Sequence, residues 1–453
     1  MQNTTAVRFS GLSGRPSAYV GLRCSACGAS GKPGRDRKER KNDEQKPAMK
    51  KMPISVHSMF EACTLNREIY RDLPNAIYAP PEIVDINDPE KFDDAIAQFL
   101  ASEEGKHLSQ EGLLRLIRRS LVECKEFCDS LIAARIESFS NKLKSLPLVD
   151  YKVVKSFHGV TINGSDVPVK FGSLVVYELP RHVDEIAKLL PWADHSGIRD
   201  EKHKRTVIEC STKARDEVKA LELANTVFNA FDLLIAFLLS EKYTDRSLGI
   251  LRMNFASRQD AIISTRGGIF SGDEARNLPN DLLDISNLSM FLPNGREGML
   301  DQFLDIVISP KNDLEKRISK AVEWTGEAYS DSNRSSAYLK TVIALEALLK
   351  IDEKGIITPS IMSSIAEQCA YLNGRSIEEC LAIERKVKVL YGRRSKIAHT
   401  GSTSVSAKDL RETRAFVRDT IWNFIHLAKK LNLSSVDAFQ STLRQRKYRD
   451  GGL

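Results

Sequence analysis

The sequence has no uninterrupted run of apolar residues long enough to cross a membrane. A membrane-spanning helix needs roughly 20 consecutive apolar residues, whereas the longest apolar run, Leu233–Leu239, has seven. This run continues a helical pattern, so it predicts a buried helix. No apolar stretch follows the first basic residues, so a secretory signal is not predicted. We therefore expect no membrane partner.

The sequence also lacks a disulfide framework and a complete metal-binding motif. Its eight cysteines are scattered along the chain, a pattern typical of reduced thiols in the cytoplasm. Cys24-x-x-Cys27 is half of a zinc site, but no second pair follows at zinc-ribbon spacing. Cys124 and Cys128 lie one turn apart on a predicted helix and are assigned to its core. We predict no metal and no cofactor.

Phosphate loops and clustered histidine ligands are not recognisable either. Gly267-Gly268 predicts a turn, because no glycine-rich strand–helix junction with a lysine is found there. His182, His195 and His203 lie among charged residues without regular ligand spacing, so we predict that each is a surface histidine.

The net charge of +7 is unevenly distributed. Residues 1–52 contain twelve Lys and Arg against four Asp and Glu, so the rest of the chain is nearly neutral. This segment is polar and aperiodic, which predicts a disordered basic tail. Its charge favours weak binding to nucleic-acid phosphates. Two alternatives are a simple solvated tail and a start site assigned too early, upstream of Met49 or Met52.

Residues 53–305 predict a mixed α+β region that senses or recognises a partner. Its first part, to about residue 145, has a helical apolar pattern after a loop around Pro80-Pro81. The period then changes to that of strands, with Asn163-Gly164 as a hairpin signal. Predicted strands lie at 151–157, 159–170, 174–179, 205–210, 251–255 and 261–265, with a long helix at 214–242 between the fourth and the fifth.

Residues 306–435 predict an all-α helical bundle, followed by a basic helix end or tail at 436–453. The predicted helices span about 312–329, 334–351, 359–372, 376–398 and 407–431. Ser376 followed by Glu379 has the spacing of a capping box. The fold class is therefore α+β, with the β-structure confined to the first two thirds of the chain.

The end of the fourth of these helices carries the strongest chemical signal. It reads Tyr391-Gly-Arg-Arg394-Ser-Lys-Ile-Ala-His399-Thr-Gly401. Arginine binds phosphate through a rigid, permanently charged fork, and histidine transfers protons near neutral pH. A bare Arg-x4-His is weak evidence, but none of the other seven histidines has an arginine five positions earlier. Together the two groups suit metal-independent chemistry on a phosphodiester.

This bundle resembles the HEPN superfamily, in particular its Apea-like branch. The resemblance rests on Arg394, Ser395 and His399, and on the helix Tyr338–Leu349, in which Glu346 follows an apolar run. It covers about residues 310–432. Many members have Gly directly after the histidine, whereas here Thr400 intervenes before Gly401.

The resemblance implies a helical homodimer with a composite site. Active members are metal-independent endoribonucleases in which arginine and histidine from both protomers meet in a cleft. They promote attack of a ribose 2′-OH on the adjacent phosphate, leaving a 2′,3′-cyclic phosphate and a 5′-OH. Many are phage-defence or toxin effectors, and others only bind.

The expected partner is therefore RNA, with an unidentified activating ligand or protein for the N-terminal region. Two alternatives are a non-catalytic HEPN module that binds RNA, nucleotide or protein, and a regulator whose helical domain only dimerises.

The spacing of the motif itself favours a dimer. Five residues on an α-helix subtend about 140°, so Arg394 and His399 do not share one face. A symmetry-related copy would supply the missing partner group.

Arg394 and His399 are the predicted catalytic residues, and the residues around them have candidate supporting roles. Arg394 would stabilise charge on the phosphate, and His399 would transfer protons. Ser395 would orient either group or contact phosphate. Glu346 would pair with Arg394 or orient His399, or it is an exposed helix carboxylate. The remaining candidates for substrate binding are Arg393 and Lys396, which alternatively form a solvated face, and Tyr391, which is alternatively a packing residue.

Overall fold

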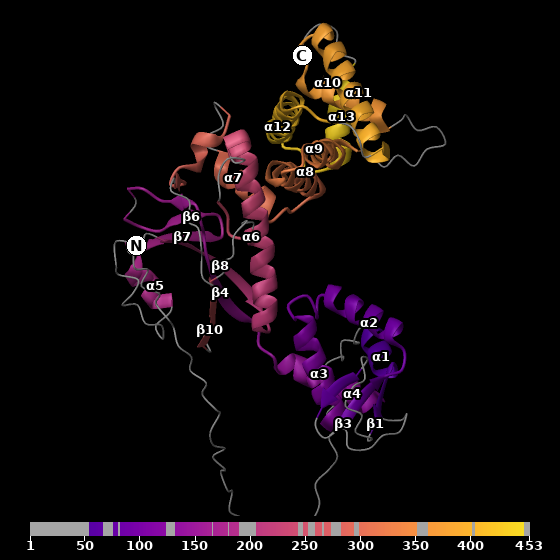
Figure 1. Ribbon diagram of the computed structural model, residues 1–453. Coiled ribbons are helices and arrows are strands. Elements are labelled where there is room, and N and C mark those ends of the chain that lie inside the picture. The colour runs from indigo at the N-terminus through magenta and orange to yellow at the C-terminus, as the bar shows by residue number, and fades with distance from the viewer. Residues whose placement is uncertain are drawn as a thin grey trace, which may run out of the picture.

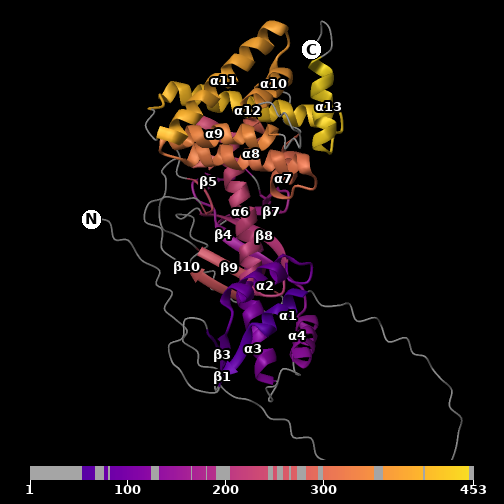
Figure 2. The same cartoon turned by 90° about the vertical axis from the view of Figure 1, so that its right-hand side faces the viewer.

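The computed structural model confirms the α+β fold class (Figure 1). It describes residues 54–66, 76–79, 82–123, 132–164, 166–179, 181–189, 205–242, 248–251, 259–264, 267–272, 282–293, 299–350, 361–400 and 404–447. The predicted tail at 1–52, Cys24, Cys27, Pro80-Pro81, Cys124, Cys128, His195 and His203 lie outside these residues, as does most of the predicted strand at 251–255. Figure 2 shows three tiers: N-terminal helices, a central sheet with one long helix, and the C-terminal helices.

The N-terminal tier packs four helices around aromatic side chains. The helices are α1 (Ile54–Glu61), α2 (Pro89–Ala101), α3 (Gln110–Glu123) and α4 (Ile132–Ser145). The ring of Phe139 meets those of Phe60 and Phe99 edge-on, with centroids 5.8 and 5.7 Å away, an arrangement that aromatic pairs prefer. A small antiparallel sheet that the helical pattern did not predict joins them, in the order β1 (Cys63–Asn66), β3 (Glu82–Ile86), β2 (Ala76–Ala79).

The central tier is a six-stranded antiparallel sheet. Its order is β10 (Gly267–Gly272), β9 (Gln259–Ser264), β4 (Val149–Ser156), β8 (Arg205–Ala214), β7 (Leu174–Leu179), β6 (Val169–Phe171). Two further strands, β5 (Val160–Thr161) and β11 (Leu283–Asp284), pair in parallel. Helix α5 (Val183–Leu189) packs on Val154 and Tyr177 of one face. Side chains of the other face, such as Val153 and Val176, enter the main core with α6 (Glu217–Leu239).

The predicted hairpin at Asn163-Gly164 and the predicted turn at Gly267-Gly268 are wrong. Asn163-Gly164 forms a turn with Gly164 at φ 74°, but it does not join two paired strands. The hairpin lies instead between β6 and β7, where Gly172 adopts φ 58°. Gly267 and Gly268 open strand β10, with Gly267 paired to Ser264 of β9, so they do not form the predicted turn.

The prediction that His182 is a surface histidine is also wrong. The side chain is fully buried, and its Nδ1 accepts a hydrogen bond from the backbone N–H of Glu178 (2.9 Å). Its ring meets the edge of Tyr177 at 6.4 Å. The packing of α5 on the sheet buries this residue, although its sequence neighbours are polar.

Helix α6 is the central element of the core. By length and composition it could cross a membrane, but every residue from Leu233 to Leu239 is buried inside the protein, which confirms the predicted buried helix. The carboxylate of Asp216 caps its first turn by accepting the N–H of Lys219 (2.9 Å). The same carboxylate accepts the N–H of Ser109 (2.9 Å), so this cap also joins the first two tiers.

The C-terminal tier contains the predicted helices and two more. They are α7 (Leu300–Ile308), α8 (Asp313–Ser330), α9 (Arg334–Leu349), α10 (Ile361–Asn373), α11 (Ile377–Thr400), α12 (Ala407–Lys430) and α13 (Val436–Lys447). Helix α13 begins the segment assigned to a basic helix end or tail, and its Phe439 stacks on Phe424 of α12 at 3.9 Å.

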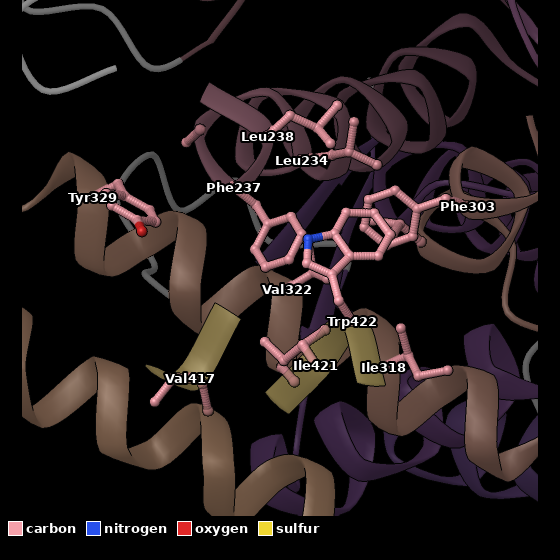
Figure 3. Close-up of a cluster of buried hydrophobic side chains, with 14 of the residues drawn as sticks. Leu234, Phe237, Leu238, Phe303, Ile318, Val322, Tyr329, Val417, Ile421 and Trp422 are labelled. Atoms are coloured by element: carbon pink, nitrogen blue, oxygen red, sulfur yellow. The ribbon is translucent and has the colours of Figure 1, made fainter. Parts of the chain in front are cut away.

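One continuous core joins this tier to the sheet. Trp422 of α12 packs against Phe237 of α6 and Phe303 of α7, with ring centroids 5.5 and 4.6 Å away (Figure 3). Leu234, Leu238 and Val322 surround the three rings. The bundle is therefore anchored on the end of α6.

Candidate functional site

Helix α11 carries the Arg–His motif in its last turns, at the helix end that the sequence predicts. Its first turn is held by the backbone N–H of Glu379, which donates to Ser376 Oγ (3.3 Å). The Glu379 carboxylate in turn accepts the N–H of Arg375 (2.8 Å), one residue earlier than in a standard capping box. Because Arg394 and His399 belong to the same regular helix, the angle and the spacing between their side chains are fixed by the helix geometry.

Arg394 lies on the side of α11 that faces α9. Its Nε is 3.4 Å from Oε1 of Glu346, and the two side chains are 33% and 22% exposed. Glu346 therefore pairs with Arg394, which is one of the roles that the sequence suggested for it. Nε is buried and has no hydrogen-bond acceptor of normal geometry among the described residues, so the contact is an ion pair only. The guanidinium is anchored by charge, while its outer nitrogens remain partly open to solvent.

Tyr391 lies one turn before Arg394 and is only 8% exposed. Its buried hydroxyl has no hydrogen-bond partner of normal geometry among the described residues. Burial raises the pKa of this hydroxyl, and the nearby Glu346 carboxylate raises it further. Tyr391 is therefore neutral at physiological pH. Its position suits packing against Glu346 better than contact with a substrate.

His399 lies on the opposite, open side of the helix. Its side chain is exposed, and within the described part of the chain no hydrogen bond or ion pair of its ring is found. At about 100° per residue it is rotated by roughly 140° from Arg394. One chain therefore does not bring the two predicted catalytic side chains together on one face.

The flanking basic and polar residues divide into two groups. Arg393 is engaged by neighbouring helices in a partly exposed ion pair: its Nη1 is 3.0 Å from Oδ2 of Asp409 on α12, and its guanidinium lies 5.8 Å from the ring of Tyr338 on α9. Hydrogen bonds from Ser406 and Arg393 lower the pKa of the Asp409 carboxyl. Ser395 and Lys396 lie at exposed positions beside the motif.

An exposed apolar stripe along α11 is a feature that the sequence reasoning missed. Ile377, Leu381 and Val389 are 73%, 53% and 65% exposed. At 100° per residue they lie within about 120° of one another, on the side of the helix that also carries His399. Gly392 lies on the same side, and a Cβ added there would meet nothing within 4 Å. The spacing of four and eight residues between these apolar positions is the sequence signal that would have revealed the stripe.

Metal ligands do not cluster near this site. In the part of the chain that the structure describes, no three His, Cys, Asp or Glu side chains are placed to hold a metal ion together. Comparisons of the chain with protein-family models, with curated proteins and with solved structures found no match. The chemistry of the site is therefore inferred from its own residues.

Proposed function

We propose that the protein is a metal-independent endoribonuclease of HEPN type that acts as a homodimer. Arg394 would bind the scissile phosphate, and His399 would transfer protons. The observation that carries this proposal is the position of the two side chains on opposite sides of α11, with Arg394 fixed by Glu346 and His399 open to solvent. Among the described residues of one chain, neither group has a catalytic partner beside it, whereas a second copy would supply one.

The exposed stripe of α11 supports a shared site. Large apolar side chains exposed on one helix face are typical of a surface that binds another protein, and Gly392 would allow a second helix backbone to approach closely. His399 lies on this same face, so pairing of two copies there would place each histidine against the partner. A two-fold interface uses the same patch on both chains, as such a stripe requires.

The proposed reaction is a transesterification within RNA. His399 accepts the proton of the ribose 2′-OH, the 2′-oxygen attacks the adjacent phosphorus, and the bond to the 5′-oxygen breaks. The leaving 5′-oxygen takes a proton from water. Arg394 stabilises the negative charge that develops on the phosphate oxygens. The products are a 2′,3′-cyclic phosphate and a 5′-OH.

Ser395 and Lys396 would support substrate binding in this scheme. Both are exposed beside the motif, and a hydroxyl and an ammonium group are both donors to phosphate oxygens. Arg393 is committed to Asp409 and Tyr338 and would hold α11 in place. Tyr391 would pack against Glu346 from within the bundle.

A second candidate function is binding of RNA, nucleotide or protein without catalysis. One observation favours it: the Arg394 guanidinium already faces a carboxylate, which reduces its charge toward a phosphate. In that case Glu346 would compete with the ligand rather than position a catalytic arginine.

Incubation of the purified full-length protein with total RNA and excess EDTA tests the proposal. We expect fragments that end in a 2′,3′-cyclic phosphate and begin with a 5′-OH. Binding without fragments, or cleavage only with added Mg²⁺, would support the second candidate or move the chemistry elsewhere. The described cysteines 63, 210, 369 and 380 are free thiols, which suits a cytoplasmic enzyme. There, cleavage of cellular RNA would make the protein a defence or toxin effector.

A further inference from the structure

Two arginines of α12 hold the C-terminal end of α6. Arg414 is almost fully buried, its Nη1 lies 3.4 Å from Oε2 of Glu241, and its Nη2 donates to the carbonyl of Ala328 on α8. Its guanidinium also lies 4.7 Å from the ring of Tyr329. One turn later, Arg418 reaches the other side of the same helix end.

Arg418 binds three groups around the last residues of α6. It donates to the carbonyl of Leu238 and to Oγ of Ser240, both at 3.4 Å, and to the carbonyl of Phe291 at 3.1 Å. The last carbonyls of a helix lack partners within the helix and carry partial negative charge, so guanidinium groups stabilise them. Ser240 has φ 51°, an unusual value for a residue other than glycine, so the chain turns sharply where the arginines bind.

Helix α12 also contacts α11 directly. Asp409 pairs with Arg393, the residue that precedes Arg394. The ammonium of Lys386 lies 4.6 Å from the ring of Phe416. A single helix thus binds the end of α6 at Arg414 and Arg418 and the catalytic helix at Asp409 and Phe416.

The interior packing makes these contacts move together. Trp422 of α12 is 1% exposed and packs against both Phe237 and Phe303, whose rings also contact each other at 5.7 Å (Figure 3). Close-packed interiors resist deformation, so we expect a shift at the end of α6 to be passed on to α12 rather than absorbed around Trp422.

We propose that α12 transmits the state of the sheet region to the Arg394–His399 site. A ligand or protein bound by the sheet region that moves the end of α6 would shift Arg414 and Arg418, and through Asp409 and Arg393 it would reposition α11. This inference rests on the proposed function for the meaning of the site, but the mechanical link itself is independent of RNA cleavage.

Hydrogen exchange measured by mass spectrometry on the full-length protein tests the link. Arg418→Gln removes the charge and the fork, and Arg411→Gln is the matched control, because Arg411 is exposed on the same helix. For Arg418→Gln we expect exchange in the peptide covering 388–399 to rise roughly fivefold or more, together with exchange at the end of α6. For Arg411→Gln we expect wild-type rates. Faster exchange at the end of α6 with unchanged exchange at 388–399 would overturn the proposal.

A second variant distinguishes a local effect on α11 from global unfolding of the protein. Arg418→Lys keeps the positive charge but loses the planar fork, and we expect the same pattern with a smaller increase. If Arg418→Gln speeds exchange throughout the chain, Arg418→Lys provides the test instead. In that variant, faster exchange confined to the end of α6 would exclude the link. RNA cleavage by the wild type is assayed separately. Its absence would remove the proposed function and leave the exchange result valid.

Discussion

Nε of Arg394 lies 3.4 Å from Oε1 of Glu346, so a carboxylate on α9 already holds the arginine that is proposed to bind phosphate. The proposed function requires this pair to position the guanidinium rather than to occupy it. A partly exposed ion pair contributes little to stability, so the pair is more informative about the orientation of Arg394 than about folding.

Glu346→Gln tests whether this carboxylate positions Arg394. The amide keeps the shape of the side chain but loses its charge, so Arg394 is no longer held in one orientation. We expect cleavage to fall roughly tenfold, while RNA affinity stays equal or rises because a negative charge near the phosphate is gone. Glu323→Gln is the control, because Glu323 of α8 is a partly exposed carboxylate that is likewise ion-paired, here with Lys320. A variant with faster cleavage would show instead that Glu346 inhibits the site.

The exposed stripe of α11 predicts a dimer that a single charge disrupts. Val389→Glu places a carboxylate on this face, and its desolvation in an interface is costly. We expect light scattering to show the mass of two chains for the wild type and of one chain for the variant, with similar helicity. Met290→Glu is the control, because Met290 is 66% exposed in a segment away from α11. If Val389→Glu stays dimeric, the interface lies elsewhere.

The buried hydroxyl of Tyr391 predicts a loss of stability at alkaline pH. Its pKa is raised in the folded state, so above about pH 10, the usual tyrosine pKa, only the unfolded chain releases the proton. Stability is therefore fully present below pH 10 and falls as pH rises beyond it. In Tyr391→Phe the free energy of unfolding should fall less steeply, by about 1 kcal/mol between pH 10 and 11. Urea denaturation at both pH values measures this difference, and identical slopes for the two proteins would argue against it.

Asp216 should be the residue at the start of α6 with the largest effect on stability. Its carboxylate accepts the N–H groups of Lys219 and Ser109, and both lose their partner in Asp216→Ala. We expect the free energy of unfolding to fall by about 2 kcal/mol. For Asp419→Ala, an exposed position on α12, we expect a change within about 0.5 kcal/mol. Equal effects of the two substitutions in chemical denaturation would contradict the capping role.

The helices of this protein could be predicted from its sequence because their signals are local. Apolar residues at helical spacing and the Ser376–Glu379 cap located α8 to α12 to within a few residues. The same local pattern placed Arg394 and His399 on different faces of α11. The pairing of Glu346 with Arg394 was one of the expectations for that residue, because α9 and α11 belong to one bundle.

Features that depend on distant contacts were missed. The sheet formed by β1, β2 and β3 consists of short strands whose partners are up to 23 residues away, as for Cys63 and Ile86. His182 is buried because α5 packs on the sheet, and no local pattern reveals that. The engagement of Arg393 by Asp409 depends on how α12 crosses α11. Local spacing alone does not encode these contacts.

The most direct test of the central claim is complementation between two inactive variants. Arg394→Ala and His399→Ala should each abolish RNA cleavage in EDTA while leaving the dimer and its helicity unchanged. If the site takes its arginine from one chain and its histidine from the other, a mixed dimer regains one complete site. An equimolar, fully exchanged mixture should then recover about a quarter of wild-type activity, because half the dimers are mixed and each has one of two sites. A mixture as inactive as the separate variants, with mixed dimers verified by mass spectrometry, would contradict a site shared between two chains.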